Sequence, residues 1–369
     1  MKTEAADIPE PDRVPGAPHP RHATRVIGQD AAAAAFLQAA QGDRLHHAWL
    51  LTGPRGVGKA TLAWAIARWL LAESGRADLA VDPDTPEARR IAALSEPRLT
   101  LIRRPWDDKT SRLRAEITVD EIRKLLSFFH LSAAEGGRRV AIIDAADEMN
   151  IPAANALLKV LEEPPSDALI LLIAHQPARL LPTIRSRCRT LRLSPLPPRQ
   201  MSAILSDMGL NEDAEALSAL SDGSVGEALR LAGQGGLDRY QDLVDLFATL
   251  PRLDRLAASK FADGAAGRAG ADGDPFDLTI TVLDRFVTRL ARAGLVGAPL
   301  PQAARGEGAL MARLSPDDHA ARIWADAQAR LSARARTGRA VNLDPAALVM
   351  DMVLELAQLP PAQASLTKA

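Results

Sequence analysis

Length, composition and charge predict a globular protein of two or three domains. The 369 residues are 47% hydrophobic and 25% charged, enough to bury a large core. A formal net charge of −1 argues against a protein that binds nucleic acid over its whole surface. Because Cys188 is the only cysteine, an internal disulfide and a zinc site built from several cysteines are both excluded. We expect a cytoplasmic protein without zinc and without membrane contact.

The first half of the sequence predicts a parallel β-sheet covered by helices. Residues 1–24 are polar and rich in proline, which favours a disordered tail. From residue 25 to residue 193, short apolar runs alternate with helical patterns, as in α/β domains. We expect strands at residues 48–52, 98–103, 140–144, 168–174 and 189–193. Residues 72–97 are acidic and weakly patterned, and we expect a helical or loop insertion there.

The second half predicts helices only. A proline cluster, Ser194–Gln200, indicates a domain boundary. It is followed by a small helical domain over residues 194–237, a larger one over 238–360, and a tail over 361–369. The composition of Phe261–Pro275 predicts a flexible loop. Long helices are expected at residues 276–293, 316–336 and 344–357, the last with Asp344 as its N-cap and Pro345 at its first position.

The stretch "GPRGVGKAT", residues 53–61, is typical of a phosphate-binding loop. Gly53, Gly58 and Lys59 match the pattern G-x-x-x-x-G-K between an expected strand and an expected helix. Gly56 and Thr61 complete the stretch. Backbone N–H groups and the start of the helix could hold phosphates, and the lysine could reach the terminal ones.

Two substitutions argue against ATP hydrolysis by this loop. Ala60 stands where the full pattern has a serine or threonine whose hydroxyl binds Mg²⁺. Thr61 is rotated from that position by ~100° around the helix. The loop could therefore keep residual nucleotide binding or serve only as a strand-to-helix turn.

The expected strand 140–144 carries the second substitution. It ends in Asp144, but Ala145 follows where an ATPase of this class has a second carboxylate. Asp147 and Glu148 come later, and we expect them to be solvated or to cap the helix after Asn150. Both departures indicate that the chain does not hydrolyse ATP.

Two later stretches carry a family resemblance. The first is "NALLKVLEEPP", which runs from Asn155 and includes Glu162 and Glu163; the second is "LLPTIRSRCRTLRL", residues 180–193. With the altered phosphate loop they resemble the clamp-loader branch of the AAA+ ATPases, in particular the delta-prime subunits of bacterial DNA polymerase III. The resemblance covers residues 21–357. It implies an AAA+ P-loop domain over residues 25–193, a small helical lid and a helical C-terminal collar.

The resemblance gives a role to the triplet Ser186-Arg187-Cys188. In the family, this arginine reaches the ATP of a neighbouring subunit, where a guanidinium can stabilise charge on the γ-phosphate. Composition alone favours a structural ion pair for Arg187, because the chain is rich in arginine. Arg185 and Arg189 would point the same way as Arg187 in an extended segment. We expect Cys188 to be a small buried residue without a catalytic role.

The resemblance also implies partners and further differences from hydrolysing subunits. The implied partners are gamma/tau and delta clamp-loader subunits and, through the complex, the sliding clamp and primed DNA. The chain would need no cofactor, apart from residual ATP or ADP. Gly226 replaces an arginine of the lid, while His175 and Gln176 stand where relatives carry small polar residues.

Three alternatives stay open at this point. A competent AAA+ ATPase of the gamma/tau kind is supported by Lys59 and Asp144 but opposed by Ala60, Ala145 and Gly226. A P-loop nucleotide kinase would need an acceptor site and a lid inserted within the α/β domain, whereas the helices here follow it. Direct DNA contact by the arginines of residues 103–114 competes with a solvated surface, which we favour because acidic residues are interspersed.

Overall fold

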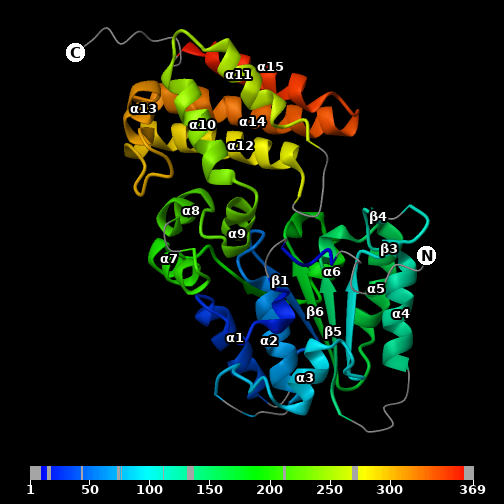
Figure 1. Cartoon of the computed structure of the whole chain (residues 1–369). Coiled ribbons are helices and arrows are strands. Elements are labelled where there is room, and N and C mark those ends of the chain that lie inside the picture. Colours follow the sequence, from blue (N-terminus) through cyan, green and yellow to red (C-terminus); the bar gives the residue numbers. More distant parts are fainter. Residues whose placement is uncertain are drawn as a thin grey trace. The chain divides into compact units, whose positions relative to one another are not determined.

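The computed structural model describes residues 10–14, 18–42, 45–72, 75, 77–110, 112–130, 137–210, 213–267 and 273–360. They belong to two compact units, with limits Met1–Leu196 and Pro197–Ala369 (Figure 1). The first unit is α/β and the second is helical in its described residues, which confirms the predicted fold class. In the described part of the chain, no helix is both long and apolar enough to cross a bilayer.

The main sheet of the first unit has five parallel strands. These are β1 (Ala48–Thr52), β2 (Leu99–Arg103), β5 (Arg139–Asp144), β6 (Ala168–Ala174) and β7 (Arg189–Arg192). Their order is β2-β5-β6-β1-β7. Each predicted strand is confirmed to within one residue at either end.

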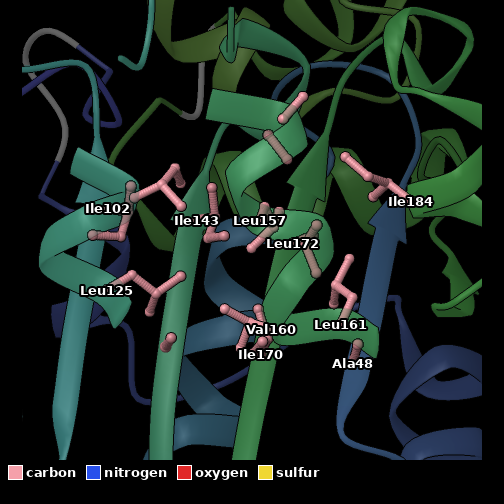
Figure 2. Close-up of a cluster of buried hydrophobic side chains, with 14 of the residues drawn as sticks. Ala48, Ile102, Leu125, Ile143, Leu157, Val160, Leu161, Ile170, Leu172 and Ile184 are labelled. Carbon is pink, nitrogen blue, oxygen red and sulfur yellow. The ribbon is translucent and has the colours of Figure 1, made fainter. Parts of the chain in front are cut away.

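Helices cover both faces of this sheet, and each strand sends alternate side chains to the two faces. Trp49 and Leu51 of β1 join one apolar cluster, and Ala48 and Leu50 join the other. The first cluster is completed by α1 (Asp30–Ala40), α2 (Lys59–Leu71) and α3 (Pro86–Ala92). The second is completed by α4 (Val119–His130), α5 (Ile151–Glu162) and α6 (Pro182–Arg185), as Figure 2 shows. Burial of both faces explains why β6 is apolar along its whole length and β1 nearly so.

Several short elements complete the first unit. Helix α3 lies in the segment for which the sequence predicts a helical or loop insertion. An antiparallel pair, β3 (Trp106–Asp107) and β4 (Arg112–Leu113), was not predicted. The 3₁₀ helices are η1 (Pro20–His22), η2 (Ala146–Glu148) and η3 (Pro177–Arg179).

The described N-terminal residues differ from the predicted disordered tail. His19 is only 2% exposed, and its Nε2 lies 2.8 Å from Oδ2 of Asp12. Arg103, at the end of β2, donates to Oδ1 of Asp12 at 2.6 Å. Arg68 of α2 donates to the backbone oxygen of Arg21 at 2.8 Å. Partners distant in sequence therefore hold this segment; residues 1–9 and 15–17 lie outside the described ones.

The second unit consists of helices in its described residues. The shorter ones are α7 (Pro198–Asp207), α8 (Ala214–Leu220), α9 (Val225–Gly233), α10 (Gly236–Ala248), α11 (Arg255–Asp263) and α13 (Glu307–Leu314). The three predicted helices are α12 (Pro275–Val296), α14 (Asp318–Ala340) and α15 (Pro345–Ala357). Asp344 caps α15 as predicted, with Oδ2 accepting from the N–H of Ala347 at 2.8 Å. The division of this unit into lid and collar stays a prediction.

The predicted loop 261–275 is shorter than expected. Its first residues, 261–263, form the last turn of α11, because Phe261 and Ala262 are buried there. Helix α12 begins at Pro275, with Oδ1 of Asp274 accepting from the N–H of Phe276 at 2.9 Å. Residues 268–272 and the predicted tail 361–369 lie outside the described residues.

A buried charge network joins three helices of this unit. Glu307, which is 0% exposed, accepts from Nε of Arg289 at 2.6 Å and from the hydroxyl of Tyr240 at 2.5 Å. The N–H of Ala303 donates to its second oxygen at 2.6 Å. Burial and the adjacent Glu307 carboxylate raise the pKa of Tyr240. Arg289 is thus a buried cation with a matched counter-ion.

Candidate phosphate loop and arginine site

The predicted phosphate loop has a backbone that only glycine accommodates easily. Gly53 has φ 146°, and a Cβ there would lie 2.4 Å from the backbone oxygen of Leu193. Gly56 and Gly58 have φ 77° and 98°, in the left-handed region that disfavours other residues. Helix α2 begins directly afterwards, at Lys59. The loop therefore keeps the strand–loop–helix geometry that its sequence predicts.

The lysine of this loop is bound by the loop itself. Nζ of Lys59 donates to the backbone oxygens of Gly53 at 2.7 Å and Pro54 at 2.6 Å, and the residue is 3% exposed. Burial lowers the pKa of Lys59 to about 8, although the carboxylates of Asp144 and Asp147 oppose the shift. An incoming phosphate would have to displace these two carbonyl contacts.

The next two residues offer no magnesium ligand at the expected position. Ala60 packs against the apolar cluster on the α2 side of the sheet. Thr61 is half-buried one position further along α2, which turns it away by ~100°. With no hydroxyl at residue 60 and with Nζ of Lys59 held by carbonyls, these residues do not fit a magnesium nucleotide as they stand.

Asp144 is the last residue of β5 and lies near Lys59. It is 7% exposed, and the following Ala145 is 3% exposed. Burial and, to a smaller extent, the carboxylate of Asp12 raise the pKa of Asp144 to about 7, and Lys59 opposes the shift. A carboxyl group that is partly protonated at neutral pH is a weak metal ligand, since metals bind the deprotonated form.

The expectation for Asp147 and Glu148 is wrong. Asp147 is buried and accepts from the backbone N–H groups of His175 at 3.0 Å and Gln176 at 2.8 Å. It therefore ties η2 to the end of β6. Glu148 pairs with Arg104 at 2.9 Å. Neither residue caps α5.

Helix α5 is capped by Asn150 instead, whose Oδ1 accepts from the N–H of Ala153 at 3.0 Å. His175 also lies in this region, and burial together with Lys59 and Arg55 lowers its pKa to about 4. A neutral imidazole is a poor general acid at neutral pH.

Arg187 occupies a different part of the first unit. Its Nη2 lies 2.9 Å from Oε1 of Glu162, and its Nη1 donates to the backbone oxygen of Thr183 at 3.0 Å. The two side chains are 37% and 49% exposed. Arg187 and Glu162 belong to separate stretches of the sequence, and the fold brings them together.

The three neighbouring arginines do not point the same way. Arg185 is the last residue of α6, and the N–H of Arg187 donates to the backbone oxygen of Ile184 at 3.1 Å. The segment is thus a helical turn, and the extended geometry considered from the sequence is wrong. The guanidinium of Arg189 lies 5.2 Å from the ring centre of Trp49. Only Arg187 of the three makes an ion pair within the described residues.

The phosphate loop and Arg187 lie at opposite ends of the parallel strands. We call the side of the sheet where the strands begin its amino edge and the side where they end its carboxyl edge. Trp49, near the start of β1, pairs with Arg189 at the start of β7, and Thr52 pairs with Arg192. The loop follows the end of β1, whereas Arg187 precedes the start of β7. The strand segment between these edges spans three residue steps of about 3.3 Å, or roughly 10 Å.

The other motif residues surround Arg187 or lie on α5. Oγ of Ser186 donates to the backbone oxygen of Thr183 at 3.1 Å. Cys188 is half-buried against the apolar cluster of Figure 2, and burial raises the pKa of its thiol to about 12. Such a thiol is inert, as expected. Asn155 and Glu163 are exposed.

The remaining positions named from the sequence make contacts within the chain. Gly226 lies in the first turn of α9, and Arg230 of that helix pairs with Glu227 at 2.7 Å. Arg103 and Arg104 pair with carboxylates of this chain, which agrees with a structural role. No cluster of histidine, cysteine, aspartate or glutamate within the described residues could hold a metal ion.

Comparisons with known proteins find similarity to subunits of DNA polymerase III. Residues 28–197 match the family described as "DNA polymerase III, delta subunit". The delta-prime subunit of Pseudomonas aeruginosa is 40% identical over 221 residues, 59% of this chain and 65% of that protein. A gamma subunit of DNA polymerase III from Buchnera aphidicola is 33% identical over 221 residues, 58% of each chain. This chain thus spans less than two thirds of either relative.

A comparison with solved structures gives a distant match. It is a gamma subunit-related protein of DNA polymerase III from Thermotoga maritima, 17% identical, with a TM-score of 0.38; the match covers 89% of this chain and 98% of that one. The parallel sheet, with a glycine-rich loop between β1 and α2, has the α/β arrangement that the sequence predicts. Residues 28–197 of this chain thus resemble the DNA polymerase III delta-subunit family, and the relative that is 40% identical is a delta-prime subunit.

Proposed function

We propose that this chain is a clamp-loader subunit of a bacterial DNA polymerase III that supplies Arg187 to the ATP site of a neighbouring subunit. It would not hydrolyse ATP with its own loop. Its partners would be gamma/tau and delta subunits, with the sliding clamp and primed DNA bound through the complex in the cytoplasm.

The observation that carries this proposal is the position of Arg187. It lies at the amino edge of the sheet, whereas the chain's own phosphate loop follows the carboxyl end of β1. A phosphate contacted by Arg187 would therefore belong to another molecule. Its 37% exposed side chain is accessible to a partner, and a guanidinium matches phosphate oxygens in a two-pronged geometry.

The state of the phosphate loop supports the second part of the proposal. Lys59 is bound to loop carbonyls, and Ala60 and Ala145 provide neither a magnesium ligand nor a second carboxylate. The rival function, a competent ATPase, remains relevant because a gamma subunit is 33% identical. Steady hydrolysis by the isolated chain, abolished by Lys59→Ala, would support that rival.

The test is the clamp- and DNA-stimulated ATPase of a loader reconstituted with gamma/tau and delta partners. Arg187→Ala should lower the rate about ten-fold or more, since arginine fingers are worth roughly 10³ to 10⁵ in GTPases. Arg185→Ala is the matched control, an exposed arginine two residues away, and it should be silent, as should Lys59→Ala. Equal assembly is checked by size-exclusion chromatography. If Arg187→Ala left the ATPase rate unchanged and Lys59→Ala strongly lowered it, the chain would use its own phosphate loop and the proposal would be wrong.

A further inference from the structure

We infer that Glu162 is a positioning residue for Arg187. Its carboxylate would hold the guanidinium in a resting position at the amino edge, and Arg187 would leave it to contact a phosphate of a neighbouring subunit. This inference rests on the proposed function. It joins the two motif stretches, since Glu162 belongs to the first and Arg187 to the second.

The contacts of Arg187 define this resting position. Nη2 pairs with Oε1 of Glu162 at 2.9 Å, and Nη1 donates to the backbone oxygen of Thr183 at 3.0 Å. Both prongs of the guanidinium are therefore engaged within the chain. The same N–H groups would be needed for two-pronged contact with a phosphate. Binding to a phosphate and binding to Glu162 thus compete.

The position of Glu162 on its helix supports this role. Glu162 is the last residue of α5, where the partial negative charge of the helix end disfavours a carboxylate. Arg187 offsets both negative charges. Within the described residues Glu162 has no other ion pair. A glutamate at this position does not stabilise α5, and Arg187 is its one counter-ion within the described residues. We therefore attribute the presence of glutamate at residue 162 to its pairing with Arg187.

The exposure of the pair sets the size of the effect. With side chains 37% and 49% exposed, the pair is screened by solvent. Exposed ion pairs shift an equilibrium by up to about five-fold. Such a pair is strong enough to orient Arg187 in the isolated chain and weak enough to yield to a phosphate of higher charge. Removing it should make Arg187 easier to recruit.

The experiment measures ATP KM and kcat of the reconstituted loader with Glu162→Gln. We expect KM to fall two- to five-fold at about 0.05 M salt with kcat unchanged, because the resting pair is lost equally in the bound state and the transition state. The difference should vanish at about 0.3 M salt, where exposed pairs are screened. Asp167→Asn is the matched control, because Asp167 is an exposed carboxylate immediately before β6 at the same edge, and asparagine tolerates its φ of 57°.

The outcomes separate this inference from the proposed function. In the Arg187→Ala background, Glu162→Gln should change nothing, as a double-mutant cycle requires. If Arg187→Ala slows the loader but Glu162→Gln matches Asp167→Asn in KM at low salt, this inference alone is wrong. A loss of kcat with unchanged KM would also overturn it. A silent Arg187→Ala would instead refute the proposed function.

Discussion

The replacement of Lys59 by methionine tests whether the phosphate loop is closed on its own lysine. Lys59 is 3% exposed, and its ammonium is bound by two backbone carbonyls. Burial lowers its pKa from 10.5 to about 8. Between these two values, the unfolded chain binds a proton that the folded chain has released. The folded state is therefore favoured as pH rises through this window. Methionine fills a similar volume and cannot titrate.

The size of the effect follows from the shift. At pH 7 Lys59 is mostly protonated in both states. At about pH 9.5 the folded state is roughly 1.5 units above its pKa, and the unfolded chain is still protonated, a difference of about 2 kcal/mol. Wild type should therefore gain about 2 kcal/mol of unfolding free energy relative to Lys59→Met between these pH values. The lost carbonyl hydrogen bonds affect both pH values alike and cancel.

The assay is urea unfolding of the isolated chain at both pH values, followed by circular dichroism. Lys109→Met is the control, because Lys109 is exposed; its difference from wild type should not depend on pH. A Lys59→Met difference that is equally independent of pH would mean that Lys59 is hydrated. The closed loop would then be wrong, and the loop would be open to phosphate.

Two further predictions concern buried groups outside the phosphate loop. Glu307→Gln should lower the unfolding free energy by about 3–5 kcal/mol, because it leaves the Arg289 cation buried without its counter-ion; urea unfolding measures this, and a loss below about 1 kcal/mol would contradict the network. Cys188 should react with iodoacetamide roughly a thousand-fold more slowly in the native chain at pH 8 than in urea, because burial raises its pKa to about 12 and the thiolate is the reactive form. Mass spectrometry follows the labelling, and equal rates would show that the thiol is not buried.

The central strands β1 and β6 could be predicted from the sequence because they are nearly continuous apolar runs with clear ends. Residues 48–52 and 168–174 have the same bounds in the structure as in the prediction. The pair β3–β4 was missed, since two-residue strands carry no periodicity. The ordered conformation of the segment with Asp12 and His19 was also not predicted. It depends on a hydrogen bond from Arg103, which lies 91 residues further along the chain than Asp12.

The site was predictable in its residues but not in its contacts. The loop glycines, Lys59 and the change at Ala60 follow from a local pattern. The buried role of Asp147 depends on the end of β6, which is distant in sequence. The pair between Glu162 and Arg187 requires the topology, because α5 ends and β7 begins at the same edge of the sheet. Local sequence patterns therefore identify the site residues, whereas the order and direction of the strands determine which of these residues are in contact.

The most direct test of the central claim counts the ATP molecules that the assembled loader hydrolyses in its first rapid turnover. If Arg187 completes one neighbouring site, Arg187→Ala should reduce the burst amplitude by one ATP per loader and leave the remaining burst at its original rate. Loss of one site would reflect one missing guanidinium. An unchanged burst, or a burst slowed at every site without loss of amplitude, would contradict the assignment of Arg187 to a single neighbouring ATP.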